Sequence, residues 1–167
     1  MFTQCLPNKE GTMPIRRLKA FLDENAVKYI SVSHSLAYTA QEIAQTANIH
    51  GQELAKTVIV KIDGKLAMAV LPGPRRVDLD LLKKAAGANQ VVLPHEAEFK
   101  DAFPECDLGA MPPFGNLYGM EVFVEESLAE DAEILFNAGS HTELIRMAYA
   151  DFTRLARPRI AKFAVGC

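Results

Sequence analysis

Two apolar stretches, Thr57-Val-Ile-Val-Lys-Ile62 and Lys65-Leu-Ala-Met-Ala-Val-Leu71, flank the dipeptide Asp63-Gly64 and decide the fold. Such stretches favour strands, and Asp-Gly tolerates the positive φ angles of a tight type I′ turn. The pattern therefore predicts a β-hairpin. Both strands are apolar on both faces, apart from Lys61 and Lys65 beside the turn, which is typical of central strands covered on each side.

Helical and extended segments alternate irregularly around this hairpin. Apolar residues at helical spacing after Pro14 predict an amphipathic helix that ends near Asn25, followed by a short strand at 27–32. Thr39-Ala-Gln-Glu42 matches a capping box, which begins a second helix. Further along the chain we expect helices at 78–86, 96–102 and 151–158, and strands at 91–93, 120–124, 132–136 and 144–148.

The order of these elements indicates the fold class. Strands come mostly in hairpins and helices interrupt them irregularly, which is typical of an α+β fold with a largely antiparallel sheet. The 167 residues suit one domain. We expect this domain to span 14–167 after a flexible N-terminal tail at 1–13, with Met13 as an alternative start.

Composition excludes several classes of protein. The chain is 49% hydrophobic and 23% charged, with a net charge of −3, which is typical of a globular protein and unlike one that coats nucleic acid non-specifically. We expect no DNA partner, and an RNA contact would need a local basic patch. The candidates are Arg16-Arg17-Lys19, Arg75-Arg76 and Lys83-Lys84, although each is also typical of a solvated face.

The location and the need for metal follow from the apolar runs, cysteines and histidines. No apolar run reaches the roughly 18 residues of a membrane span, and the first fourteen residues contain no signal-peptide core. The cysteines Cys5, Cys106 and Cys167 are scattered, and the four histidines have no zinc-site spacing. We therefore expect a reduced, cytoplasmic protein without a disulfide framework, bound metal or cofactor.

Two features carry chemical meaning in a chain that has no G-x-S-x-G, P-loop or G-x-G-x-x-G motif. Lys56 opens the first apolar strand, where it either extends its ammonium into water or places a fixed cation at the mouth of a pocket. Residues 109–115 read Gly-Ala-Met-Pro-Pro-Phe-Gly. They form either a plain turn or a rigid loop whose amides point at a ligand oxygen, as in an oxyanion hole.

Three stretches occur in a recognisable order: Ala55-Lys-Thr-Val-Ile-Val60, then Gly109-Ala-Met-Pro-Pro113, then Phe136-Asn-Ala-Gly-Ser-His141. Together they resemble the lysine-bearing strand, the GxxxP loop and the second hairpin of the YbaK/prolyl-tRNA synthetase-associated family of aminoacyl-tRNA editing domains. Phe114-Gly115 extends the match, and the helix at 151–158 also fits. The resemblance covers about 14–158, which is nearly the whole chain.

The resemblance implies a mixed sheet, partly closed like a barrel and surrounded by helices. It also implies a trans-editing deacylase that hydrolyses the ester of tRNA mischarged with a small amino acid, namely Ala, Ser or Thr. By carry-over, the catalytic residues are Lys56, which positions the terminal adenosine or its phosphate, and Gly109, whose amide holds the substrate carbonyl.

The resemblance places further residues around the substrate. The expected substrate-binding residues are Thr57, Pro113, Phe114, Ser140 and His141. Lys56-Thr57 departs from the Lys-Asn dipeptide of family members that edit alanyl-tRNA-Pro. The sequence of residues 109–114 is more similar to that of members that act on seryl- or threonyl-tRNA. The hydroxyl-bearing side chains in this set slightly favour serine and threonine as the amino acids removed.

The expected partner is the acceptor end of aminoacyl-tRNA, with an aminoacyl-tRNA synthetase as a second partner to consider. Attack by water on an already reactive ester agrees with the lack of a catalytic triad. We interpret Cys106 as a small buried residue rather than a nucleophile. The sequence leaves two alternatives open: a non-catalytic module that binds the tRNA end or a nucleotide, and a hydrolase of small amino-acid esters.

Overall fold

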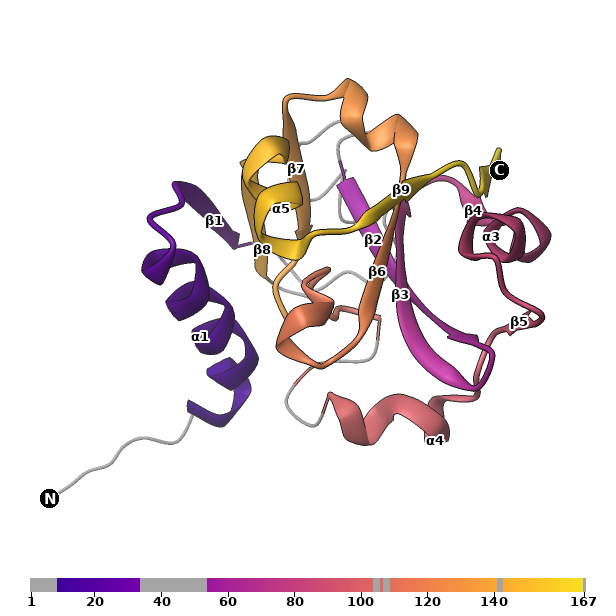
Figure 1. Ribbon diagram of the computed structural model, residues 1–167. Helices are drawn as coiled ribbons and strands as arrows, with labels where there is room; N and C mark the ends of the chain where they lie inside the picture. Colours follow the sequence, from indigo (N-terminus) through magenta and orange to yellow (C-terminus); the bar gives the residue numbers. More distant parts are fainter. Residues whose placement is uncertain (1–8, 34–53, 104–105, 107–108, 141–142, 167) are drawn as a thin grey trace, which may run out of the picture.

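A mixed sheet with helices around it is seen in the computed structural model, which describes residues 9–33, 54–103, 106, 109–140 and 143–166 (Figure 1). Its helices are α1 (Lys9–Glu24), α3 (Leu79–Ala86), α4 (Glu96–Phe99) and α5 (Tyr149–Ala156), with 3-10 turns η2 (Lys100–Ala102), η3 (Gly115–Leu117) and η4 (Glu126–Glu130). Its strands are β1 (Tyr29–Ser33), β2 (Leu54–Ile62), β3 (Lys65–Pro72), β4 (Arg76–Val77), β5 (Val91–Val92), β6 (Glu121–Glu125), β7 (Glu133–Asn137), β8 (Glu143–Ala148), β9 (Arg159–Ala161) and β10 (Ala164–Val165). None of these helices is long and apolar enough to cross a membrane.

The predicted hairpin is confirmed. Strands β2 and β3 pair antiparallel from Ala55 opposite Pro72 to Ile62 opposite Lys65. The turn residue Asp63 has φ 49° and Gly64 has φ 87°. Both angles are positive, as a type I′ turn requires.

The helix ends partly match the prediction. In α3, Asp78 caps the first turn by accepting the amide hydrogens of Asp80 and Leu81, and Gly87 ends the helix with φ 66°. Helix α1 begins at Lys9, so residues 9–13 belong to a helix rather than to the expected tail. Helix α5, expected at 151–158, begins earlier at Tyr149, with Ala148 as its N-cap, and ends at Ala156. The predicted helix that starts at residue 39 lies outside the described residues.

The main sheet has the order β1-β8-β7-β2-β3-β6-β9, and β5 pairs with the end of β2. Parallel pairs join β2 to β7, β3 to β6 and β6 to β9, whereas the other neighbours are antiparallel. The mixed sheet is thus confirmed, with a larger parallel part than the hairpin pattern indicates. Over the described residues the sheet is open, with β1 and β9 at its two ends, so the expected partial closure into a barrel is not seen.

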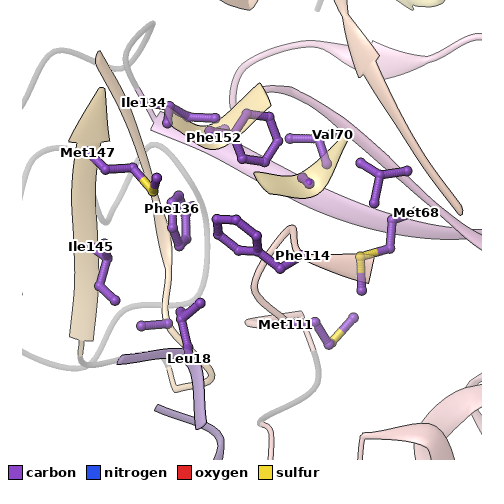
Figure 2. Close-up of a cluster of buried hydrophobic side chains, with 14 of the residues drawn as sticks. Leu18, Met68, Val70, Met111, Phe114, Ile134, Phe136, Ile145, Met147 and Phe152 are labelled. Carbon is purple, nitrogen blue, oxygen red and sulfur yellow. The ribbon is translucent and has the colours of Figure 1, made fainter. Parts of the chain in front are cut away.

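The two faces of the sheet bury two separate hydrophobic cores, as predicted for central strands. One core lies under α1 and α5 and contains Leu18, Phe114, Phe136 and Phe152 (Figure 2). The other lies under α3 and contains Val60, Leu71, Leu82 and Phe163. Successive residues of a strand point to opposite faces, so membership of a core fixes the direction of each side chain in β2.

A buried carboxylate clasps the C-terminal segment onto the sheet. Glu125 is 1% exposed and accepts the amide hydrogens of Phe163 at 2.6 Å and Ala164 at 2.8 Å. Arg75 donates to the carbonyl oxygen of Ala164 at 3.1 Å, and β10 pairs with β4. These contacts fix the chain that leaves β3, including Arg76.

Candidate functional site

The candidate site lies where β7 separates from β2. Strand β7 pairs in parallel with the first two residues of β2, and β5 pairs antiparallel with its last two. Between them, the register on this edge of β2 skips residues 56–60. The two parallel strands therefore diverge directly beside Lys56, at the carboxyl end of β7.

Two loops that are distant in sequence meet at this divergence. The turn after β7 is closed by a hydrogen bond from the amide of Ala138 to the carbonyl oxygen of Glu143, at 3.0 Å. The next amide, that of Gly139, donates to the carbonyl oxygen of Ala110 at 2.9 Å. The structure thus joins the 109–115 loop to the 138–140 turn, and both lie at the end of β7.

Lys56 lies on the face of the sheet that carries the second core. Its neighbours Ala55 and Ile59 belong to the first core, whereas Val58 packs against the second. Alternation along the strand therefore directs the half-buried Lys56 side chain to the side of Val58. The side chain is partly covered rather than fully extended into solvent, which favours the fixed-cation interpretation.

The 109–115 loop is rigid for reasons visible in its packing. Gly109 has φ 86°, in the left-handed region that favours glycine, and it is exposed, whereas the five residues after it are buried. The Phe114 ring lies 5.8 Å from Phe21, 5.7 Å from Phe136 and 5.5 Å from Phe152, centroid to centroid (Figure 2). The exposed glycine is thus mounted on a loop that is anchored in the core.

The expected substrate-binding residues lie on different faces of the sheet and differ in their burial. Phe114 is 0% exposed, so its ring fixes the loop instead of forming a pocket wall. Thr57 stands opposite Val70, a first-core residue, and so points to the face opposite Lys56. Pro113 is buried in the loop and Ser140 is half-buried in the turn. His141 lies outside the described residues.

Asn137 begins the 137–141 turn that the sequence predicts as a wall of the substrate pocket, but it is not among the individually predicted site residues. It ends β7, is 8% exposed and has a buried side-chain oxygen without a hydrogen-bond partner. The only sequence signal was its place in the Phe-Asn-Ala-Gly-Ser-His stretch. Its burial depends on tertiary packing, which sequence spacing does not reveal.

An ionic cluster holds the base of the 138–140 turn. Glu143 accepts hydrogen bonds from the Ser31 hydroxyl and from the Lys19 ammonium, the latter at 2.9 Å. Burial raises the pKa of the Glu143 carboxyl, but these hydrogen bonds and the charge of Lys19 outweigh it and lower that pKa below 4.5. Helix α1 is thereby tied to β8 next to the site.

The candidate RNA-binding residues fall into two groups. Arg17 donates to the Leu117 carbonyl oxygen at 2.6 Å, and Lys19 and Arg75 are engaged in the contacts described above. Arg76 and the two lysines of α3 are exposed instead. Arg76 follows the end of β3, the strand in which Leu71 pairs with Lys56, so it lies at the same end of the sheet as the site.

Other reactive groups lie apart from this constellation. Cys106 is half-buried, and its sulfur lies 3.5 Å from the Tyr118 hydroxyl oxygen. The described residues contain no group of three or more His, Cys, Asp or Glu side chains that could hold a metal ion. A groove of about 800 Å³ is lined by Lys65, Tyr118 and Glu121 among others, near the hairpin turn at the other end of β2 from Lys56.

Comparison with known proteins identifies relatives of similar and of much greater length. The Multifunctional Ser/Thr-tRNA deacylase ProXp-y of Escherichia coli (strain K12) is 26% identical over 159 residues, which cover 92% of this chain and 95% of that protein. A proline–tRNA ligase of Bacillus mycoides (strain KBAB4) is 26% identical over 89 residues, which are 53% of this chain and 16% of the ligase.

Solved structures share the fold. A candidate trans-editing enzyme for prolyl-tRNA synthetase superposes with a TM-score of 0.78 at 19% identity, over 92% of this chain and 98% of that one. A hypothetical protein superposes with a TM-score of 0.81 at 17% identity, over 89% and 99%. The sequence profile of the aminoacyl-tRNA editing domain matches residues 34–155, the part of the chain that contains the strand, loop and turn of the candidate site. The chain therefore belongs to the aminoacyl-tRNA editing domain family.

Proposed function

We propose that this protein is a trans-acting deacylase that hydrolyses the ester of tRNA mischarged with serine, threonine or alanine. The observation that carries the proposal is the meeting of Lys56, the Gly109 loop and the 138–140 turn at one end of the sheet in a chain of the editing family. The similarity to a Ser/Thr-tRNA deacylase over nearly the full length of both chains supports the choice of amino acids.

The proposed reaction is attack of water on the ester carbonyl. The exposed backbone at Gly109 would hold the carbonyl oxygen as negative charge develops, and the core-anchored Phe114 would keep that amide in place without reorganisation. Lys56 would bind the terminal phosphate or ribose and so orient the ester. The ribose hydroxyl beside the ester can assist the water, so this scheme needs no side-chain base.

The buried loop and the turn support a small pocket. Residues 110–113 are buried and include two consecutive prolines, and the Phe114 ring anchors them in the core, so this wall cannot move aside for a large side chain. Ser140 is half-buried in the 138–140 turn and carries a hydroxyl group. We therefore infer that hydroxyl-bearing amino acids are accepted and leucine is rejected.

Partners and location follow from the substrate. The exposed Arg76 and the α3 lysines supply positive charge for the acceptor arm of tRNA on a chain whose net charge is −3. Because charged tRNA is used in the cytoplasm, we place the protein there. The ligase similarity over half of the chain supports a prolyl-tRNA synthetase as the partner on whose products it acts.

The test is a deacylation assay with the full chain and tRNAs charged with serine, threonine, alanine and leucine, alongside free seryl ester. Hydrolysis of the first three charged tRNAs, with leucyl-tRNA and the free ester spared, is the expected result. Tight binding without hydrolysis would identify a binding module instead, and rapid cleavage of the free ester would identify a general esterase. Activity that survives a chelator and the Cys106→Ala change supports the water mechanism.

A further inference from the structure

The buried side-chain amide of Asn137 has an oxygen atom whose hydrogen-bonding capacity is not satisfied. The residue is 8% exposed, and its Oδ1 atom is buried and has no hydrogen-bond partner. A buried acceptor without a donor lowers stability, because its hydrogen bonds to water are lost on folding and not replaced. Native proteins keep few such groups, and each one needs an explanation, such as a ligand that completes the hydrogen bond.

The strand register places this amide beside Lys56. Ala55 pairs in parallel with Phe136, and both side chains belong to the first core. The next residue in each strand, Lys56 in β2 and Asn137 in β7, therefore points to the opposite face. The pairing of β2 with β7 ends at Ala55 and Phe136, so Lys56 and Asn137 are the first residues beyond it on the same face, where the strands diverge.

The described surroundings of Asn137 on its own strand and the next are apolar. Leu135 lies two residues earlier on the same face and is 1% exposed. Leu144 is its antiparallel partner in β8 and is 0% exposed. A leucine at position 137 would suit Leu135 and Leu144, so these two described neighbours give no reason for an amide there.

The amide is also held firmly in place. Asn137 is followed by the turn that the Ala138–Glu143 and Gly139–Ala110 hydrogen bonds close. Asn137 therefore follows the pairing with the strand of Lys56 and precedes the turn that contacts the 109–115 loop. The part of the substrate next to the ester would therefore be the group that binds to the Asn137 side chain.

We infer that Asn137 is a substrate-binding residue whose side-chain oxygen accepts a hydrogen bond from the aminoacyl group of the substrate. The inference rests on the proposed deacylase function. Two donors have the required chemistry, the side-chain hydroxyl of a seryl or threonyl group and the α-ammonium group. A site that pairs with a substrate hydroxyl discriminates against analogues that lack it far more strongly than an apolar pocket does.

The decisive variant is Asn137→Leu, assayed for stability by urea denaturation and for kcat/KM with seryl-tRNA and alanyl-tRNA. Removing an unpaired polar group should leave stability unchanged or raise it. Losing the hydrogen bond should lower kcat/KM for seryl-tRNA by about 10- to 100-fold, in line with one hydrogen bond to a polar or charged group. The matched control is Asn116→Leu at an exposed asparagine in η3. This variant should change neither the stability nor kcat/KM.

Comparison of kcat/KM for seryl-tRNA and alanyl-tRNA distinguishes the hydroxyl donor from the α-ammonium donor. A fall confined to seryl-tRNA identifies the hydroxyl, and an equal fall for both substrates identifies the α-ammonium group. Unchanged kcat/KM for both, or a loss of stability in step with activity, would overturn the inference, and Asn137→Ala is judged by the same readouts if the leucine variant does not fold. If the unmodified protein hydrolyses neither tRNA, the proposed function itself is wrong.

Discussion

Gly139 donates its backbone N–H to the carbonyl oxygen of Ala110 at 2.9 Å, and this one hydrogen bond joins two loops that are 29 residues apart. On one side it holds the loop that starts with Gly109, and on the other it holds the turn that follows Asn137. Because β7 pairs with β2, the same contact brings both loops to Lys56. The proposed site depends on this arrangement, and the predictions below test its parts.

Lys56→Ala should lower the single-turnover rate of deacylation by roughly 10²-fold or more, the size of effect seen when one oriented charge or donor is removed from a catalytic site. The fold should persist, because Lys56 belongs to neither core. Lys61→Ala is the control, since Lys61 lies on the same strand and pairs with Glu98 at the surface. Circular dichroism accompanies the rates, and a folded Lys56→Ala protein with full activity would contradict the role.

Gly109→Ala and Gly64→Ala form a matched pair of backbone changes. The glycines have φ 86° and 87°, so alanine costs each variant a similar amount, about 1–2 kcal/mol. Only Gly109 lies in the site, so only its variant should also lose kcat. Thermal unfolding and deacylation rates check this, and equal activity of the two variants would exclude an oxyanion role for the loop.

Arg76→Ala should raise KM for charged tRNA several-fold and leave kcat unchanged, because Arg76 is exposed at the site end of the sheet. Loss of one phosphate contact lowers the slope of log affinity against log salt by about one. The control is Lys65→Ala, an exposed cation at the opposite end of β3. If KM and its salt dependence match those of the unmodified protein, the acceptor arm does not cross this surface.

Acid should weaken the attachment of α1 through Glu143. The folded-state pKa of this carboxyl lies below its ordinary value of 4.5, so the stability it provides is complete above about pH 4.5 and is lost as the pH falls through the folded-state pKa. Glu143→Gln should therefore reduce Tm at pH 7 while showing a smaller further fall at pH 3. Glu130→Gln, at an exposed position in η4, is the control and should follow the unmodified protein.

Local sequence determined the elements whose signals are short-range. The β2–β3 hairpin follows from two apolar runs around Asp63-Gly64, because the turn chemistry and the strand pattern agree. Helix α3 follows from a cap at Asp78 and a glycine at position 87. The same local reading placed Lys56 and Gly109 as candidates and gave the family resemblance.

Local signals were weaker where pairing partners supply the stability. Strands β4, β9 and β10 have two or three residues each, too few to show a pattern, and they form because partners elsewhere in the sheet and the Glu125 clasp hold them. The parallel pairing of β2 with β7 likewise joins segments that no turn connects directly. Such pairings depend on the whole fold, since local propensity does not specify distant partners.

By itself, the sequence of this protein determined the central hairpin, the mixed α+β class and the candidate chemistry of Lys56 and Gly109. Only the tertiary structure decided that Phe114 is an anchor in the core and that Thr57 and Lys56 face opposite sides of the sheet. It also decided that the Asn137 side-chain oxygen is buried without a hydrogen-bond partner among the described residues. The physical reason is that a side chain's direction and burial are set by the strands and loops that pack against it. These partners come from distant parts of the chain, and their contacts exist only once the chain has folded.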